Sequence, residues 1–82
     1  MADFTGYVNG LDVQAMPGQR VRCPAFISKQ GGAEEIQVSA YEHALQTVLE
    51  HATARGPEVE VEAAYDDGDG EKVLRRVRVL DR

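Results

Sequence analysis

The chain has 82 residues, a single cysteine and a formal net charge of −5 at pH 7. A chain of this length forms one domain, residues 1–82, and buries only about 60 to 65% of its unfolded surface. A lone cysteine excludes an intrachain disulfide and favours a cytoplasmic location. We expect no membrane span, because no segment approaches the ~20 apolar residues required, and no signal peptide. The negative charge repels phosphate backbones, so nucleic-acid binding is not favoured.

Residues 3–15 predict a long first strand, because apolar residues alternate along two phases: Tyr7, Leu11, Val13 and Ala15 on one, Phe4 and Val8 on the other. Gly6 and Gly10 interrupt this pattern. Glycines inside a strand mark a bend or bulge, so we expect the strand to bend and to contribute to two sheets.

Two further strands follow in the first half of the chain. Residues 16–19, Met-Pro-Gly-Gln, predict a type II turn with proline second and glycine third. The next alternating faces are Val21, Cys23, Ala25 and Ile27, and then Ile36, Val38 and Ala40. Pro24 lacks an amide donor, so the second strand needs an edge or a bulge there.

A helix is predicted from Ala40 to Arg55, where apolar residues recur at intervals of three and four: Tyr41, Ala44, Leu45, Val48, Leu49 and Ala52. Ser39 and Glu42 have the spacing of a capping box at its start. Gly56 and Pro57 predict its end, because glycine tolerates the left-handed conformation and proline cannot continue the helix. His43, Thr47 and His51 fall on the polar side.

The last 25 residues predict a hairpin whose apolar faces are Val59, Val61, Ala63 and Tyr65, and then Val73, Val77 and Val79. Pairing Val61 with Val77 places Glu62 opposite Arg76 and Glu60 opposite Arg78, so the charges cancel across the strands. This register leaves Gly68, Asp69 and Gly70 as the loop. Arg75 falls on the apolar face, so the sheet must end, twist or bulge there, or the Arg75 guanidinium must extend past the edge of the core to solvent. Leu74 and Leu80 fall on the charged face.

The element order predicts a mainly β protein with one helix (α+β). Five strands with the helix between the third and fourth resemble the OB-fold, a five-stranded barrel in the order β-β-β-α-β-β. The glycine-interrupted first strand fits, because that strand must curl to close a barrel. A β-grasp-like sheet with an additional strand is the alternative.

These residues do not supply a nucleophile or base together with a group to orient it and a site to bind charge. We therefore expect no enzyme activity, no cofactor and no metal. Cys23 alternates with core residues and is expected to be a buried, inert thiol. His43 and His51 lie about 12 Å apart along a helix, too far to share one metal ion. The turn from Asp67 spaces oxygen ligands like a calcium loop, but its sixth and twelfth positions are lysine and arginine.

The favoured function is a small non-enzymatic binding or assembly module that engages a protein partner or forms a homo-oligomer. Apolar residues outside the core phases supply the candidate interface: Leu74, Leu80, Phe4 and Val8. In a closed barrel, Phe4, Val8 and Phe26 would instead fill part of the core. The alternative is a single-stranded nucleic-acid-binding face formed by Arg20, Arg22, Phe26 and Lys29.

Overall fold

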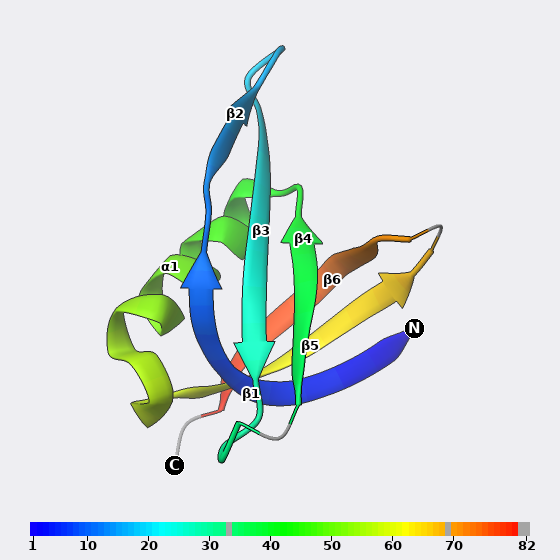
Figure 1. The fold of residues 1–82 in the computed structure, drawn as a ribbon. Helices are drawn as coiled ribbons and strands as arrows, with labels where there is room; N and C mark the ends of the chain where they lie inside the picture. Colours follow the sequence, from blue (N-terminus) through cyan, green and yellow to red (C-terminus); the bar gives the residue numbers. More distant parts are fainter. Residues whose placement is uncertain (33, 69, 81–82) are drawn as a thin grey trace.

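A computed structural model describes residues 1–32, 34–68 and 70–80. Its elements, labelled in Figure 1, are β1 (Ala2–Leu11), β2 (Gln14–Met16), β3 (Arg20–Ser28), β4 (Glu35–Ala40), α1 (His43–Arg55), the short 3-10 helix η1 (Gly56–Glu58), β5 (Glu60–Asp67) and β6 (Lys72–Leu80). The protein is therefore mainly β with one helix, as the sequence predicts. None of the helices in the described ranges is long and apolar enough to cross a membrane.

All six strands belong to one mixed sheet in the order β1-β5-β6-β4-β3-β2. An additional pairing of β1 with β3 closes a hydrogen-bond ring through five of these strands and leaves β2 outside the ring. The ring has its shortest pairing between β4 and β6. These two strands run parallel and share one residue pair, Ser39 with Val73. The expected first strand is thus two strands, and the shorter one, β2, extends from the body with the tip of β3 (Figure 1).

β1 bends across the molecule and serves two neighbours, as expected (Figure 1). Its first half pairs with β5 from Ala2 to Gly6, and its second half pairs with β3 from Tyr7 to Leu11, with a register shift between Val8 and Gly10. Gly6 lies where the strand passes from one neighbour to the other. A Cβ atom at this position would overlap the carbonyl oxygen of Ser28, so the bend requires glycine.

The β2–β3 hairpin turns at residues 17–19, where Gly18 takes a φ of 77°, as expected of the glycine in a type II turn, and Gln19 also has a positive φ of 60°. The proline expected to need an edge or bulge, Pro24, lies opposite the break between β1 and β2, where its carbonyl accepts a hydrogen bond from the Asp12 N–H. The nitrogen and the carbonyl of one strand residue point to the same side. The donor that Pro24 lacks would face Asp12, so the proline removes the reciprocal ladder bond of this pair at the point where β1 and β2 are interrupted.

The helix begins three residues later than predicted, at His43 rather than Ala40. The predicted capping box is wrong: Ser39 and Ala40 are buried residues of β4, and the N-cap residue Glu42 makes no side-chain capping bond. Ala40 pairs with Cys23 of β3, and this pairing keeps the backbone extended where the sequence pattern predicts helix. The end is as predicted, with Gly56 at a φ of 61° and its N–H donating to the carbonyls of Ala52 and Thr53.

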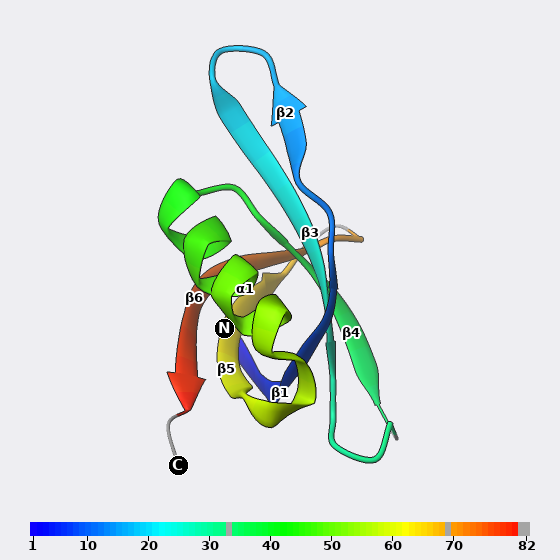
Figure 2. The same ribbon diagram turned by 90° about the vertical axis from the view of Figure 1, so that its left-hand side faces the viewer.

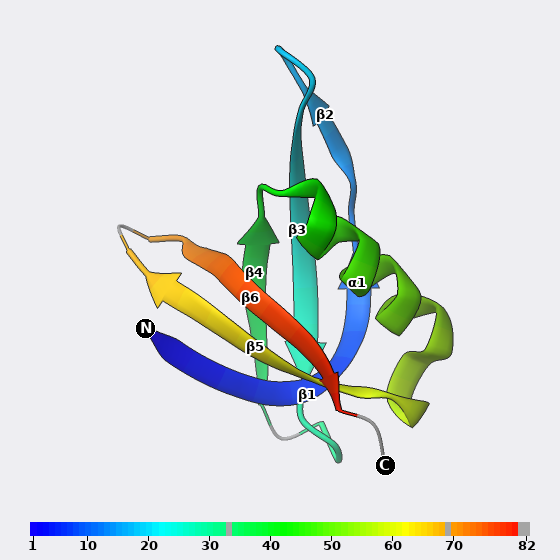
Figure 3. The same ribbon diagram turned by 180° about the vertical axis from the view of Figure 1, so that it is seen from behind.

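The apolar face of α1 packs against β1 and β6 (Figures 2 and 3). Leu45, Leu49 and Ala52 are buried, and His43, Thr47 and His51 are exposed, both as expected. Tyr41 and Ala44, which the helical pattern assigns to the apolar stripe, are exposed instead. Tyr41 precedes the helix, so the helical spacing does not apply to it.

The register of the last hairpin differs from the predicted one by two residues. Val61 lies opposite Val79 rather than Val77, Glu62 opposite Arg78 rather than Arg76, and Glu60 opposite Leu80 rather than Arg78. A shift of two preserves which face each side chain occupies, because the side-chain period of a strand is two. Charge cancellation is therefore kept with other partners, as in the Glu62–Arg78 ion pair at 3.1 Å. The predicted loop includes Asp69, which lies outside the described residues.

A bulge in β6 leaves Arg75 without a strand partner, because the consecutive residues Ala64 and Tyr65 of β5 lie opposite Arg76 and Leu74. Beyond it, Leu74 lies opposite Tyr65 and is only 1% exposed, so the expectation that Leu74 occupies the charged face is wrong. The bulge expected at Arg75 is therefore confirmed, because Arg75 is the extra residue of β6. Arg75 itself points outward and forms an ion pair with Asp66 at 2.6 Å.

The core lies inside the strand ring and beneath α1. It contains the predicted faces of β3, β4 and the helix, and also Phe4, Val8 and Leu74, which the sequence pattern placed on outward phases. Val79 is the opposite case: it was assigned to the core face and is 40% exposed.

Candidate functional site

The outward side of β2, β3 and β4 carries the densest set of exposed aromatic, apolar and polar side chains. Strand pairing places them on one side, because Gln14 lies opposite Arg22 and Met16 opposite Arg20, while Phe26 lies opposite Gln37. Tyr41, directly after β4, reaches the same side through its hydroxyl. We call this set the outer face: Gln14, Met16, Arg20, Arg22, Phe26, Gln37 and Tyr41.

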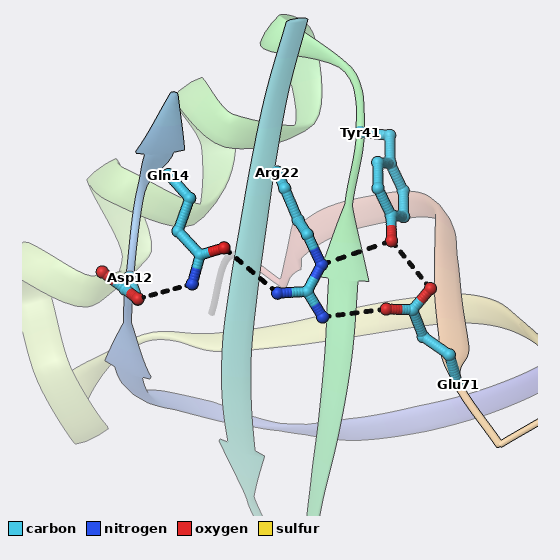
Figure 4. A network of polar contacts seen from close by, with 5 residues as sticks. All are labelled: Asp12, Gln14, Arg22, Tyr41 and Glu71. Carbon is cyan, nitrogen blue, oxygen red and sulfur yellow. Dashed lines mark hydrogen bonds and ion pairs between the residues drawn. The ribbon is translucent and has the colours of Figure 1, made fainter. Parts of the chain in front are cut away.

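Arg22 is the centre of a polar network on the outer face (Figure 4). Its Nη2 donates to Oε2 of Glu71 at 2.9 Å, its Nη1 donates to Oε1 of Gln14 at 3.2 Å, and its Nε donates to the Tyr41 hydroxyl at 3.4 Å. The Tyr41 hydroxyl in turn donates to Oε1 of Glu71 at 2.7 Å. Gln14 extends the network by donating to Asp12 at 2.9 Å. All three nitrogens of the guanidinium are thus engaged.

These contacts favour the charged forms of both central groups. The hydrogen bond from Tyr41, followed by that from Arg22, lowers the pKa of Glu71. The hydrogen bond to Glu71, followed by that to Tyr41, raises the pKa of Arg22. Both side chains are partly exposed, at 30% for Arg22 and 38% for Glu71, so solvent screens the pair.

The network also connects the strands on both sides of the shortest pairing in the ring, the one between β4 and β6. Arg22 belongs to β3, Tyr41 follows β4 and Glu71 precedes β6. The three side chains therefore join both sides of the β4–β6 junction, where only Ser39 and Val73 pair. We call the contacts among Arg22, Tyr41 and Glu71 the clasp.

Two aromatic rings of the outer face remain exposed, one of them belonging to the clasp. Phe26 and Tyr41 each expose 40% of their surface. Gly10 of β1 lies beside Phe26, where a Cβ atom would be 3.3 Å from the phenyl ring. The absence of a side chain at Gly10 leaves room for the ring against the sheet, so one side of it stays open to solvent.

The structure buries three of the four residues expected at a partner interface. Phe4, Val8 and Leu74 are 8%, 2% and 1% exposed and belong to the core. The first two fill the ring because the bend of β1 turns their phase inward, and the third is buried by the bulge at Arg75 of β6. Leu80 is half-buried and lines a pocket of about 220 Å³ with Val79, Arg55 and residues of η1.

The expected nucleic-acid face is brought together in part. Arg20, Arg22 and Phe26 share the outer face, but Lys29 lies on the other side of the strand, with its Nζ 5.3 Å from the centre of the Phe4 ring. Arg22 is occupied by the carboxylate of Glu71. Of the predicted cations, Arg20 alone stays on this face without an ion pair among the described residues.

Other candidate chemistry stays dispersed. Burial raises the pKa of the Cys23 thiol, which disfavours the reactive thiolate. In the described part of the chain, no group of three or more histidine, cysteine, aspartate or glutamate residues is placed to hold a metal ion. A second pocket, of about 340 Å³, lies beside β4 and is lined by Ile36, Gln37, Ser39, Glu71 and neighbouring residues.

Sequence reasoning missed Gln14, Tyr41 and Glu71 as partners of Arg22. Glu71 is 49 residues away along the chain and was interpreted as part of a solvated turn. No local sequence pattern indicates such a contact, because it depends on the parallel pairing of β4 with β6. The chain matches no protein-family model, and comparisons with curated proteins and with solved structures find no significant match to either.

Proposed function

We propose that this protein is a small non-enzymatic binding module of OB-like architecture that engages a protein partner, or a second copy of itself, through the outer face. The architecture is supported by the closed ring of five strands, by the bent β1 and by the position of α1 between the third and fourth strands of the ring. Ring closure disfavours the alternative of an open β-grasp-like sheet. A lone, buried, reduced cysteine fits the proposed cytoplasmic location.

The proposal rests mainly on one observation. Exposed aromatic rings share the outer face with Arg22, whose charge is already neutralised by Glu71. Phe26 and Tyr41 offer large, stiff apolar surfaces, which are the residues that anchor protein interfaces. Arg22, on the same face, gives its nitrogens to Glu71, Tyr41 and Gln14. The Glu71 carboxylate bound to Arg22 repels a phosphate group, whereas a neutral polar partner meets no such repulsion.

A second candidate function is single-stranded nucleic-acid binding. It is favoured by one observation, that Arg20, Arg22 and Phe26 occupy the same face of β3. An aromatic platform beside cations is the usual arrangement for stacking bases. The net charge of −5 and the carboxylate of Glu71 count against it.

Two measurements on the whole chain separate these functions. Sedimentation equilibrium at low and high protein concentration reports self-association, and fluorescence anisotropy with a labelled single-stranded oligonucleotide at low and physiological salt reports nucleic-acid binding. The matched variants are Phe26→Ser on the outer face and Val79→Ser, which changes a side chain of the same 40% exposure on β6. Both side chains are exposed enough for the variants to fold.

We expect concentration-dependent association that Phe26→Ser abolishes and Val79→Ser retains, with no oligonucleotide bound at physiological salt. A protein that stays monomeric and binds the oligonucleotide with a steep salt dependence, lost in Arg22→Gln, would overturn the proposal in favour of the nucleic-acid function. Loss of association in Val79→Ser alone would place the interface at the end of β6 with Leu80.

A further inference from the structure

The first half of β4 has an open edge. The Glu34 carbonyl accepts a hydrogen bond from the Lys29 N–H at 2.8 Å, so the even-numbered residues that follow along β4 direct their backbone groups to β3. By the strand period, the N–H and C=O groups of Glu35, Gln37 and Ser39 point to the opposite side. Only Ser39 meets another strand there, at Val73.

The residues of β4 that precede Ser39 do not pair with β6. In the ranges that the structure describes, Glu35 and Gln37 therefore have no strand beside them on this side, and Figure 2 shows β4 along one border of the molecule. Two N–H and two C=O groups in register form a template for one more strand. We call the backbone of Glu35 and Gln37 the open edge.

A pocket of about 340 Å³ accompanies the open edge. Ile36 and Gln37 line it from β4, Gly70 and Lys72 line it from the other side, and the clasp residues Arg22 and Glu71 close one end. An extended main chain therefore has space next to the donors and acceptors that it would pair with. The half-buried side chain of Ile36 supplies an apolar contact beneath it.

The charge around the open edge is negative. The neighbouring cations are matched by acids: Arg22 by Glu71, Lys72 by Asp67 and Arg75 by Asp66. Glu34 and Glu35 are exposed and form no ion pair within the described ranges, and Glu35 accepts only the Ser28 hydroxyl. An incoming strand that carries lysine or arginine complements these carboxylates, and the net charge of −5 favours its approach.

We propose that the open edge of β4 binds an extended, basic peptide segment of a partner protein by strand addition, with its main chain paired to Glu35 and Gln37 and its cations beside Glu34 and Glu35. This rests on the proposed function, since it names the kind of protein partner that the module engages. Main-chain pairing provides affinity in this mode, and the carboxylates select charge.

The probe is a short synthetic peptide of alternating valine and lysine, titrated into the isotope-labelled whole chain. Fluorescence anisotropy reports binding, and amide exchange measured by NMR reports where the strand pairs. One control peptide replaces lysine with glutamate. A second keeps lysine but carries N-methyl groups on alternate residues, which removes its main-chain donors and leaves its charge.

The protein variants are matched at two strand edges, those of β4 and β2, that have no neighbouring strand in the described ranges. Gln37→Pro removes the N–H that faces the open edge, and Ala15→Pro makes the same change on β2, where Ala15 also points away from β3. Glu35→Lys reverses the charge without touching the backbone. Circular dichroism establishes that each variant is folded, and Glu35→Lys decides the case if Gln37→Pro fails to fold.

We expect the valine–lysine peptide to slow exchange of the Glu35 and Gln37 amides, and the glutamate and N-methyl peptides to have no such effect. Gln37→Pro and Glu35→Lys should each weaken binding about tenfold, the effect of losing one hydrogen bond or one ion pair in such a contact, and Ala15→Pro should leave it unchanged. Equal affinity for the N-methyl peptide would overturn strand addition.

The failures of the two proposals are distinguishable. A peptide that shifts the NMR signals of Phe26 and Tyr41 without protecting Gln37 overturns the open edge and retains the outer face as a protein-binding surface. Protection of Ala15 moves the pairing to β2 and likewise overturns the β4 assignment. A chain that binds none of the peptides, stays monomeric and binds only an oligonucleotide overturns both proposals.

Discussion

Two glycines of β1 face β3 but differ in what a methyl group would meet there. A Cβ atom at Gly6 would overlap the backbone carbonyl of Ser28, whereas one at Gly10 would meet only the Phe26 ring, at 3.3 Å. We predict that Gly6→Ala lowers the free energy of unfolding by about 1 to 3 kcal/mol, because backbone must move. Gly10→Ala should stay within about 1 kcal/mol of the parent, since a side chain can turn aside and alanine restricts the unfolded chain. Urea denaturation measures both, and equal losses would contradict the close approach at Gly6.

Glu71 predicts a pH-dependent contribution of the clasp to stability. Its pKa is lowered in the folded protein by the hydrogen bond from Tyr41 and then by that from Arg22. A lowered folded-state pKa means that this stabilisation is present above the ordinary glutamate pKa of about 4.3 and is lost as the pH falls through the lower, folded value. We therefore expect Glu71→Gln to be less stable than the parent at neutral pH, with the difference disappearing in acid. Urea midpoints of both proteins between pH 7 and strongly acidic pH test this, and a difference that grows on acidification would contradict it.

At the scale of elements, the bulge at Arg75 of β6 decides on which face Leu74 lies. Leu74 is 1% exposed, although uninterrupted alternation assigns it to the charged face. Val79 shares the face of the buried Val77 but lies near the end of the strand, where it is 40% exposed. We predict that Leu74→Ala lowers the free energy of unfolding by about 2 to 5 kcal/mol through cavity formation. Val79→Ala should change it by no more than about 0.5 kcal/mol. A larger loss in Val79→Ala than in Leu74→Ala would show that the alternation without a bulge is correct.

The helix allows a similar comparison along one element. Leu45 is 9% exposed and packs into the core, while Thr47 is exposed and its hydroxyl donates to the His43 carbonyl within the helix. We expect Leu45→Ala to lower the free energy of unfolding by about 2 to 4 kcal/mol. Thr47→Ala, which raises helix propensity, should be neutral or slightly stabilising. If thermal denaturation of Leu45→Ala matched the parent, α1 would not be packed as described.

At the scale of the whole molecule, the strand ring predicts a pattern of amide exchange. β5 is paired on both sides, with Val61 and Ala63 opposite residues of β1 and of β6. Their amides should exchange slowly, near the rate set by global unfolding. The amides of Ala15 and Gln37 face open edges and should exchange rapidly although both lie in strands. Hydrogen exchange monitored by NMR measures all four, and slow exchange at Gln37 in the free protein would mean that the edge of β4 is already covered.

The sequence by itself determined the class of fold and most of its local elements. Alternation located β3, β4, β5 and β6, and the buried residues Val21, Cys23, Ala25 and Ile27 are the ones it predicted. The glycine-proline pair ended the helix where expected, and the two glycines of β1 marked its bend. These features are local, because side-chain period and the backbone preferences of glycine and proline act within a few residues. No local signal located the helix start, since pairing of Ala40 with Cys23 overrode the capping pattern.

Only the tertiary structure decided which phase of each strand is inside and which side chains meet. Ring closure turned Phe4 and Val8 inward, and the bulge at Arg75 buried Leu74, so three expected interface residues became core. The clasp joins residues as far as 49 positions apart, and the open edge of β4 exists only because β6 crosses it at a single residue pair. Such contacts follow from how strands from distant parts of the chain are registered, and alternation is unchanged by a register shift of two residues. The candidate sites are for that reason properties of the closed ring, whereas the strands that build it are properties of the sequence.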